Sequence, residues 1–237
     1  MIDLYGMGSP NVVRVYVALE ELGLQYQVKP IDVFSGQQFE GEFRKLNPLA
    51  KVPVIVDHEG PGGKPYTVFE SAAILLYLSE KTGKLLPKDT AAKFDAIQWM
   101  IQAVTTLGPM LGQYVHYIRF APQEGQEYSR SRYRTQAHRV FEVAEERLGT
   151  SQWLGGSEFS VADIAWFPWA RMLPLLLGAD DAKRYGKVAA WVERVAARPA
   201  VAKALAATDD VRAKTTPFDK AAPEHLDRMF GRGQHAA

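Results

Sequence analysis

The stretch Asn47-Pro48-Leu49-Ala50-Lys51-Val52-Pro53-Val54-Ile55-Val56 decides how the first part of this sequence folds. The β-branched run Val52-Pro53-Val54-Ile55-Val56 predicts a strand. Pro53 near its start fits either a trans proline at a strand start or a cis bond between Val52 and Pro53. In the cis alternative, the Val52 N–H and C=O would face away from the sheet and could pair with an extended peptide. The local sequence by itself favours trans, because cis bonds are rare.

Strand and helix signals alternate on both sides of this stretch. A short strand around Ile2 and Leu4 precedes Ser9-Pro10, which fits a helix cap followed by the first helical residue, and Gly23 ends that helix. Further strands are expected at 26–31, 52–56 and 66–69, a loop with a short helix at 35–44, and a closing helix up to Gly83. The order β-α-β, crossover, β-β-α is the thioredoxin-like arrangement.

After Leu86-Pro87 the pattern becomes helical. The sequence therefore predicts an α/β, thioredoxin-like domain at 1–86, an all-α domain at 91–207, and a polar tail at 208–237 that is partly disordered or strapped across the body. Within the helical part, Ser160 and Asp163 fit a capping box, with Asp in place of the usual Glu. These two residues are expected to be structural.

Composition excludes several classes of function. The 237 residues contain no cysteine, so no disulfide framework, thiolate zinc site or protein thiol nucleophile is possible. The five histidines lack metal-ligand spacing, and no metal is expected. With 28 basic and 27 acidic residues, the chain does not resemble a general nucleic-acid binder. We see no targeting segment and no membrane span, so we expect a cytoplasmic protein with no membrane partner.

Two short motifs stand where a strand meets a helix. Glu70-Ser71 offers a carboxylate beside unpaired helix amides, which suits a ligand end that carries both an amino group and a carboxylate. Asn11, after Ser9-Pro10, lies beside the amides of the first helix, where a thiolate would be stabilised. Ser71 also fits an ordinary helix N-cap beside an acidic residue, and Asn11 also fits an ordinary surface residue after a cap at Ser9, so the local sequence leaves both interpretations open.

The order of these motifs resembles the cytosolic glutathione S-transferase superfamily over nearly the whole length. The matching segments are Asn47 to Pro53, Phe69-Glu70-Ser71-Ala72-Ala73-Ile74-Leu75, and Phe159-Ser160-Val161-Ala162-Asp163-Ile164. The Ser9-Pro10-Asn11 entry, the Gly36-Gln37-Gln38-Phe39 loop and the Trp166–Trp169 stretch look most like the bacterial nu-class, the disulfide-bond reductase type, and its fungal nitrogen-regulator relatives.

The resemblance implies roles for particular residues. Glu70 and Ser71 would hold the γ-glutamyl end of glutathione, and Val52, with a cis Pro53, would pair with the cysteinyl backbone. Lys51 and Gln38 would lie near the glycyl carboxylate. Asn11 would face the sulfur, and Ser9 would either assist it or only cap the helix. Arg132 would reach the thiol pocket from the helical domain, although its arginine-rich surroundings fit a solvated helix face equally well.

The function implied is glutathione-dependent disulfide reduction with weak conjugating activity, with two glutathiones or glutathione disulfide as ligand, in a homodimer. Because the chain has no cysteine, every reacting sulfur would have to arrive with a ligand. Two alternatives remain: general conjugation of electrophiles for detoxification, and a non-catalytic glutathione-binding regulator. The second substrate and the role of the tail are not readable from the sequence.

Overall fold

The computed structural model describes residues 1–236. Its contacts divide the chain into two compact units, Met1–Leu78 with Ala200–Ala237, and Ser79–Pro199. Each unit is described by itself. The domain boundaries expected at residues 86, 91 and 207 stay predictions.

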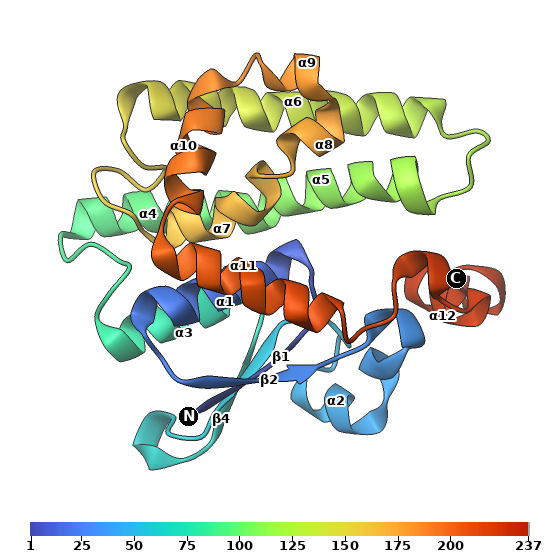
Figure 1. The fold of residues 1–237 in the computed structure, drawn as a ribbon, viewed down its shortest axis with the longest axis horizontal. Coiled ribbons are helices and arrows are strands. Elements are labelled where there is room, and N and C mark those ends of the chain that lie inside the picture. Colours follow the sequence, from blue (N-terminus) through green and yellow to red (C-terminus); the bar gives the residue numbers. More distant parts are fainter. Residues whose placement is uncertain (237) are drawn as a thin grey trace. The chain divides into compact units, whose positions relative to one another are not determined.

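A four-stranded mixed sheet forms the centre of the first unit (Figure 1). Its order is β2-β1-β3-β4, made of β1 (Ile2–Gly6), β2 (Tyr26–Pro30), β3 (Val54–Asp57) and β4 (Tyr66–Phe69). Strand β1 runs parallel to β2 and antiparallel to β3, and β4 runs antiparallel to β3. Leu4, which is fully buried, pairs with Val28 on one side and Ile55 on the other. The predicted thioredoxin-like arrangement is confirmed.

The helices of this part follow the signals in the sequence. They are α1 (Pro10–Leu22), α2 (Gly41–Leu46) and α3 (Ser71–Thr82), with 3-10 turns η1 (Val33–Ser35), η2 (Gln37–Phe39) and η3 (Pro61–Gly63). Helix α1 is buried on nearly every side, since Val12, Val15 and Leu19 have no exposed surface. Gly23 ends it with φ of 65°, a left-handed conformation that glycine adopts without strain.

The C-terminal residues also belong to the first unit. They form most of α11 (Pro199–Arg212), then η6 (Phe218–Lys220), α12 (Pro223–Phe230) and η7 (Gly233–His235). Helix α11 lies beside α1 (Figure 1), where Lys203 Nζ is 3.1 Å from Glu20 Oε2. The segment that the sequence predicted as a polar tail is therefore built from short helices packed against the sheet-containing unit.

The second unit is helical, as predicted. Its elements are α4 (Thr90–Gln102), the π-helical turn η4 (Ala103–Leu107), α5 (Gly108–Val115), the π-helical turn η5 (His116–Phe120), α6 (Glu127–Thr150), α7 (Val161–Ala170), α8 (Leu173–Leu177), α9 (Ala179–Ala182) and α10 (Gly186–Ala196). Every residue of α7 is buried, so this helix forms the centre of the unit.

Asp163 is the polar centre of this unit. Its carboxylate is fully buried and accepts hydrogen bonds from Leu154 N at 2.9 Å, Ser160 N at 3.0 Å and Trp191 Nε1 at 2.8 Å. With Ser160 it forms a capping box at the start of α7. The Ser160 hydroxyl donates a fourth hydrogen bond, at 3.3 Å. Burial raises the pKa of Asp163, and these four hydrogen bonds act in the opposite direction. The group ties α7 to the preceding loop and to α10.

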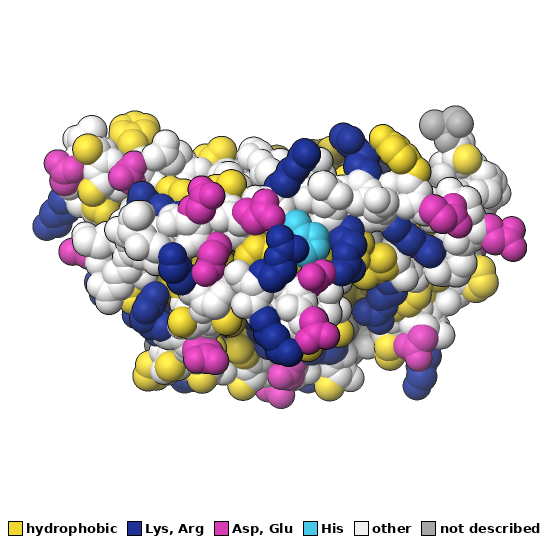
Figure 2. All heavy atoms as spheres, turned by 90° about the horizontal axis from the view of Figure 1, so that it is seen from above, with side chains coloured by type: hydrophobic (Ala, Val, Ile, Leu, Met, Phe, Trp, Pro, Cys, Tyr) yellow, Lys and Arg dark blue, Asp and Glu magenta, His cyan; other side chains and the backbone are white. Residues whose placement is uncertain are grey.

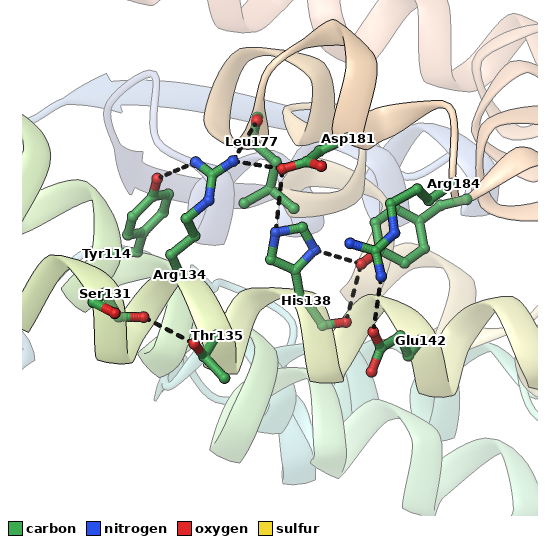
Figure 3. A network of polar contacts seen from close by, with 10 residues as sticks. Tyr114, Ser131, Arg134, Thr135, His138, Glu142, Leu177, Asp181 and Arg184 are labelled. Atoms are coloured by element: carbon green, nitrogen blue, oxygen red, sulfur yellow. Dashed lines mark hydrogen bonds and ion pairs between the residues drawn. The ribbon is translucent and has the colours of Figure 1, made fainter.

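A second polar network joins α6 to the segment around α9 (Figure 3). Arg134 donates to Asp181 at 2.5 Å and to the Tyr114 hydroxyl at 3.2 Å. His138 contacts Asp181 with one ring nitrogen, at 3.4 Å, and the Tyr185 hydroxyl with the other, at 2.7 Å.

Figure 2 shows basic and acidic side chains interleaved on the face it presents.

No helix among residues 1–236 is both long and apolar enough to cross a membrane.

Candidate functional site

A surface pocket of about 160 Å³ opens in the first unit where three segments meet. The segments are the start of α1, the loop between α2 and β3, and the junction of β4 with α3. The residues that line the pocket are Asn11, Asn47, Lys51, Val52, Pro53, Glu70 and Ser71. Six of these seven are residues that the sequence predicted as site residues, drawn from three separate parts of the chain.

Asn47 shapes the wall that comes from the loop before β3. Its side chain is 1% exposed, donates to the Lys51 carbonyl at 2.8 Å and accepts from Leu49 N at 3.0 Å. These two bonds close the loop on itself and hold Lys51 and Val52 at the pocket. The Val52–Pro53 peptide bond is cis, the alternative that the local sequence alone did not favour.

Two opposite charges stand at the pocket without ion partners. The side chains of Lys51 and Glu70 make no hydrogen bond or ion pair with any residue in 1–236. Glu70 also has φ of 68°, and Ala50, next to Lys51, has φ of 54°, both in the left-handed region that non-glycine residues seldom occupy. Such conformations persist where the surrounding structure imposes them and are frequent at ligand sites.

The start of α1 supplies the third wall. Ser9 is the N-cap residue of α1, as predicted, and its carbonyl accepts from Val12 N and Val13 N at 3.0 Å each, but its side chain makes no capping hydrogen bond. Pro10 has no N–H, and the Asn11 N–H has no partner among residues 1–236. Asn11 therefore offers a free amide at the positive end of the helix dipole, a position that favours an anion.

Ser71 is the first residue of α3 rather than the residue before it. The Glu70 carbonyl accepts from Ile74 N at 2.9 Å, so Glu70 stands at the cap position that the sequence assigned to Ser71. The Ser71 side chain is 6% exposed and points to a partner inside the unit.

That partner is Arg14, a residue that the sequence analysis missed. Arg14 is 1% exposed, and one nitrogen, Nη1, donates to Asn11 Oδ1 at 2.8 Å and to Ser71 Oγ at 3.1 Å. It thus joins the α1 wall of the pocket to the α3 wall through buried hydrogen bonds. Burial lowers its pKa to about 10, which leaves the guanidinium charged at neutral pH. Its signal in the sequence is a lone arginine in an apolar helix, one turn after Asn11.

Three of the other predicted residues do not line the pocket. Ser9 immediately precedes α1 without lining the pocket. Gln38 is 2% exposed, and its side chain makes no hydrogen bond to residues 1–236. Arg132 is an exposed residue of α6 in the second unit. The roles expected for these residues stay predictions.

The pocket as a whole suits a small ligand that carries both positive and negative charge. Glu70 attracts a cation, Lys51 attracts an anion, and the free amide of Asn11 at the helix N-terminus favours a further negative group. Among residues 1–236 there is no cluster of His, Cys, Asp or Glu that could hold a metal ion.

Known proteins match the chain in both units. The family model for the glutathione S-transferase N-terminal domain matches residues 8–81, and that for the C-terminal domain matches residues 107–199. The disulfide-bond oxidoreductase YfcG of Escherichia coli is 42% identical over 206 residues, which cover 86% of this chain and 94% of the relative. A second Escherichia coli protein, the disulfide-bond oxidoreductase YghU, is 34% identical over 211 residues, which cover 84% of this chain and 72% of that protein.

Solved structures match at the level of the whole fold. A glutathione transferase from Burkholderia graminis, solved with two glutathione molecules per subunit, has a TM-score of 0.81 and 39% identity, covering 86% of this chain and 87% of that one. One from Pseudomonas putida, with one glutathione disulfide per subunit, has a TM-score of 0.81 and 37% identity, covering 86% and 90%. The chain is a member of the glutathione S-transferase family.

Proposed function

We propose that this chain binds glutathione in the pocket of its first unit and uses it to reduce disulfides, with weak conjugating activity. The observation that carries the proposal is the pocket itself. It combines an unpaired carboxylate, an unpaired ammonium and a helix N-terminal amide within one small lining set. The names of the Escherichia coli relatives and the ligands in the solved relatives support the same activity.

Glutathione has a charged group or a peptide unit for each part of the pocket. The γ-glutamyl end carries an amino group and a carboxylate, which Glu70 and the amides at the start of α3 would hold, with Ser71. The backbone of Val52 would pair with the cysteinyl unit. Lys51 would attract the glycyl carboxylate. Gln38, buried with an unpaired amide, is proposed to lie near that same end.

Because the chain has no cysteine, every sulfur that reacts in the proposed disulfide reduction comes from glutathione or from the substrate. Asn11, with the dipole of α1, would lower the pKa of the glutathione thiol so that it binds as a thiolate. The thiolate attacks one sulfur of a disulfide, a mixed disulfide forms, and the second sulfur leaves as a thiolate that takes up a proton. A second glutathione thiolate then attacks the mixed disulfide and releases glutathione disulfide and the second product thiol.

Arg14 would position this machinery rather than touch the ligand. Its bond to Asn11 Oδ1 fixes the orientation of the Asn11 amide, so the Nδ2 donor faces away from Arg14. The same nitrogen holds Ser71. The proposal also assigns Arg132 to the second glutathionyl unit and Ser9 to a supporting role at the sulfur.

The assembly and location belong to the same proposal. We propose a homodimer, supported by family membership and by two large apolar side chains seven positions apart on α4, Phe94 and Ile101, which are 61% and 41% exposed. A cytoplasmic location fits an enzyme that draws on glutathione, the thiol that keeps cytosolic proteins reduced. Sedimentation velocity at two protein concentrations tests the dimer.

Paired activity assays test the proposed function. The purified chain is given glutathione and either hydroxyethyl disulfide or an aryl halide, and the two values of kcat/KM are compared. We expect the disulfide to be reduced much more efficiently than the aryl halide is conjugated. Efficient conjugation with no disulfide reduction would establish the detoxification alternative instead. Glutathione binding with no turnover of either substrate would establish the regulatory alternative.

A further inference from the structure

The C-terminal residues contact the segment between β2 and α2, which does not line the pocket itself but packs against the wall that does. Residues 200–237 lie beyond the residues that the family models match. Figure 1 shows α12 beside the segment between β2 and α2, and the two segments are in contact. We call residues 213–235 the C-terminal strap and residues 32–39 the η loop. Both belong to the first unit.

Asp32 joins the strap to the η loop. Its Oδ2 accepts from Thr216 N at 3.0 Å and from Thr216 Oγ1 at 2.6 Å, while Oδ1 accepts from Ser35 N at 3.3 Å. The Asp32 carbonyl also accepts from Ser35 N and Gln37 N, at 3.2 Å each. One residue therefore organises the η loop and fastens it to the strap.

Three side-chain contacts extend this attachment along the loop. Phe218 packs edge-on against Phe34, with ring centroids 5.7 Å apart. The Arg228 guanidinium lies over the Phe39 ring at 4.3 Å. His225 packs against Gly36, whose φ is 83°. A Cβ at this position would lie 2.7 Å from His225 Nδ1, so only glycine fits. The strap therefore holds the loop from its first residue to its last.

The η loop is coupled to the pocket wall through a small apolar cluster. Ile31, Phe43 and Val54 form its buried centre, and Val33, Leu46 and Val52 pack against it. Val33 belongs to the η loop, Leu46 precedes Asn47, and Val52 lines the pocket. A shift of the loop is therefore transmitted to the wall that carries Asn47, Lys51 and Val52, because close-packed clusters have little room to absorb it.

The η loop also contains a buried side chain, Gln38, that does not stabilise it through any hydrogen bond within the described part of the chain. Gln38 is 2% exposed and has no hydrogen bond to residues 1–236. An unpaired buried amide favours opening of the segment that contains it. Contacts from outside the loop must offset this tendency, and the strap supplies four of them, through Thr216, Phe218, His225 and Arg228.

We propose that the C-terminal strap is a positioning segment of the ligand site. It keeps the η loop closed and thereby keeps the Asn47–Pro53 wall in its binding geometry. The inference rests on the proposed function only in naming glutathione as the ligand whose binding depends on the strap. The hold of the strap on the loop can be measured without any ligand.

A truncation and a matched pair of point variants test this proposal. Removal of residues 215–237 deletes all four strap contacts and leaves α11 intact, whereas removal of residues 233–237 deletes none of them. Thr216→Val loses the 2.6 Å bond to Asp32. Thr215→Val is its control, because Thr215 Oγ1 bonds only to carbonyls of Val211 and Arg212 among residues 1–236. Hydrogen exchange of the Ser35 and Gln37 amides and the KM and kcat for glutathione are measured.

The expected results separate a positioning role from a purely structural one. Removal of 215–237 should speed exchange of the loop amides at least about tenfold and raise KM, while kcat stays within about twofold. Thr216→Val should change both quantities in the same direction by about fivefold, the effect of one hydrogen bond, and the two controls should change neither. If the chain without residues 215–237 does not fold, the loop exchange and the KM of Thr216→Val decide whether the proposal holds.

Unchanged loop exchange, or faster exchange with unchanged KM, would overturn the proposal. If the full chain does not bind glutathione, the proposed function fails, and the ligand-free exchange data still show whether the strap holds the loop.

Discussion

Replacement of Arg14 by Met should separate activity from stability. The side chain is buried, so a residue of similar length fills its volume. Burial lowers the pKa of Arg14 to about 10, which corresponds to a desolvation cost of about 3 kcal/mol. The bonds to Asn11 and Ser71, each worth about 1.5 kcal/mol with a charged donor, are among the contacts that offset that cost. We therefore expect the free energy of unfolding to change by less than about 1 kcal/mol.

Activity should respond very differently, because Asn11 loses its fixed orientation. Asn11 is exposed, and among residues 1–236 its side chain bonds only to Arg14, so without Arg14 its amide becomes free to rotate. A displacement of about 1 Å in a reacting group costs about 100-fold in rate, and we expect kcat/KM for disulfide reduction to fall by about that factor. Arg14→Lys keeps the charge without the planar fork and should lose most of the same activity.

The assay pairs urea denaturation with steady-state kinetics for wild type, Arg14→Met and the control Arg139→Met, on an exposed arginine of α6. The control should leave both quantities unchanged. Full activity in Arg14→Met would refute the positioning role of Arg14. A loss of stability of several kcal/mol, with activity falling only in proportion to unfolded protein, would show that Arg14 is merely structural.

Three further predictions concern the pocket and the second unit. Asn11→Ala should lower kcat for disulfide reduction by about 100-fold with little change in KM, because one preorganised hydrogen-bond donor is lost. An unchanged kcat in steady-state kinetics would show that Asn11 takes no part in the mechanism. Glu70→Gln should raise the dissociation constant for glutathione at least about 30-fold in calorimetry, because a paired charge is lost, and a smaller effect would argue against contact with the ligand's amino group. Since burial raises the pKa of Asp163 above 3.8, the native state keeps this proton to higher pH than the unfolded state. The free energy of unfolding of wild type should therefore exceed that of Asp163→Asn by a margin that shrinks as pH rises above 3.8. Urea denaturation at several pH values measures this margin. A margin that grows with pH would contradict the raised pKa of Asp163.

The fold was predictable because its signals are local. β-Branched runs mark β3 and β4, and Gly23 stops α1 through its own backbone conformation. The capping residues of α7 are likewise three positions apart. Each of these signals acts within a few residues, so a single sequence shows it.

The parts of the site that could not be predicted depend on distant residues. Arg14 matters because it reaches Ser71, 57 positions away, and an arginine in an apolar helix gives no hint of that partner. The C-terminal strap matters because Thr216 meets Asp32, 184 positions away. The local rule places Ser9 correctly at the N-cap of α1, yet its side chain makes no capping hydrogen bond. Tertiary contacts override local preference at these points.

The central claim is that the pocket ionises a thiol that the ligand brings. Because the chain has no cysteine, the thiolate absorbance of its complex with glutathione comes from the ligand alone. This absorbance, followed against pH below the range where tyrosines ionise, gives the pKa of the bound thiol in wild type and in Asn11→Ala. The account predicts a pKa well below the value of about 8.5 for a free cysteine thiol, and a return toward that value in the variant. A bound thiol that titrates like the free one in the wild-type protein would contradict it.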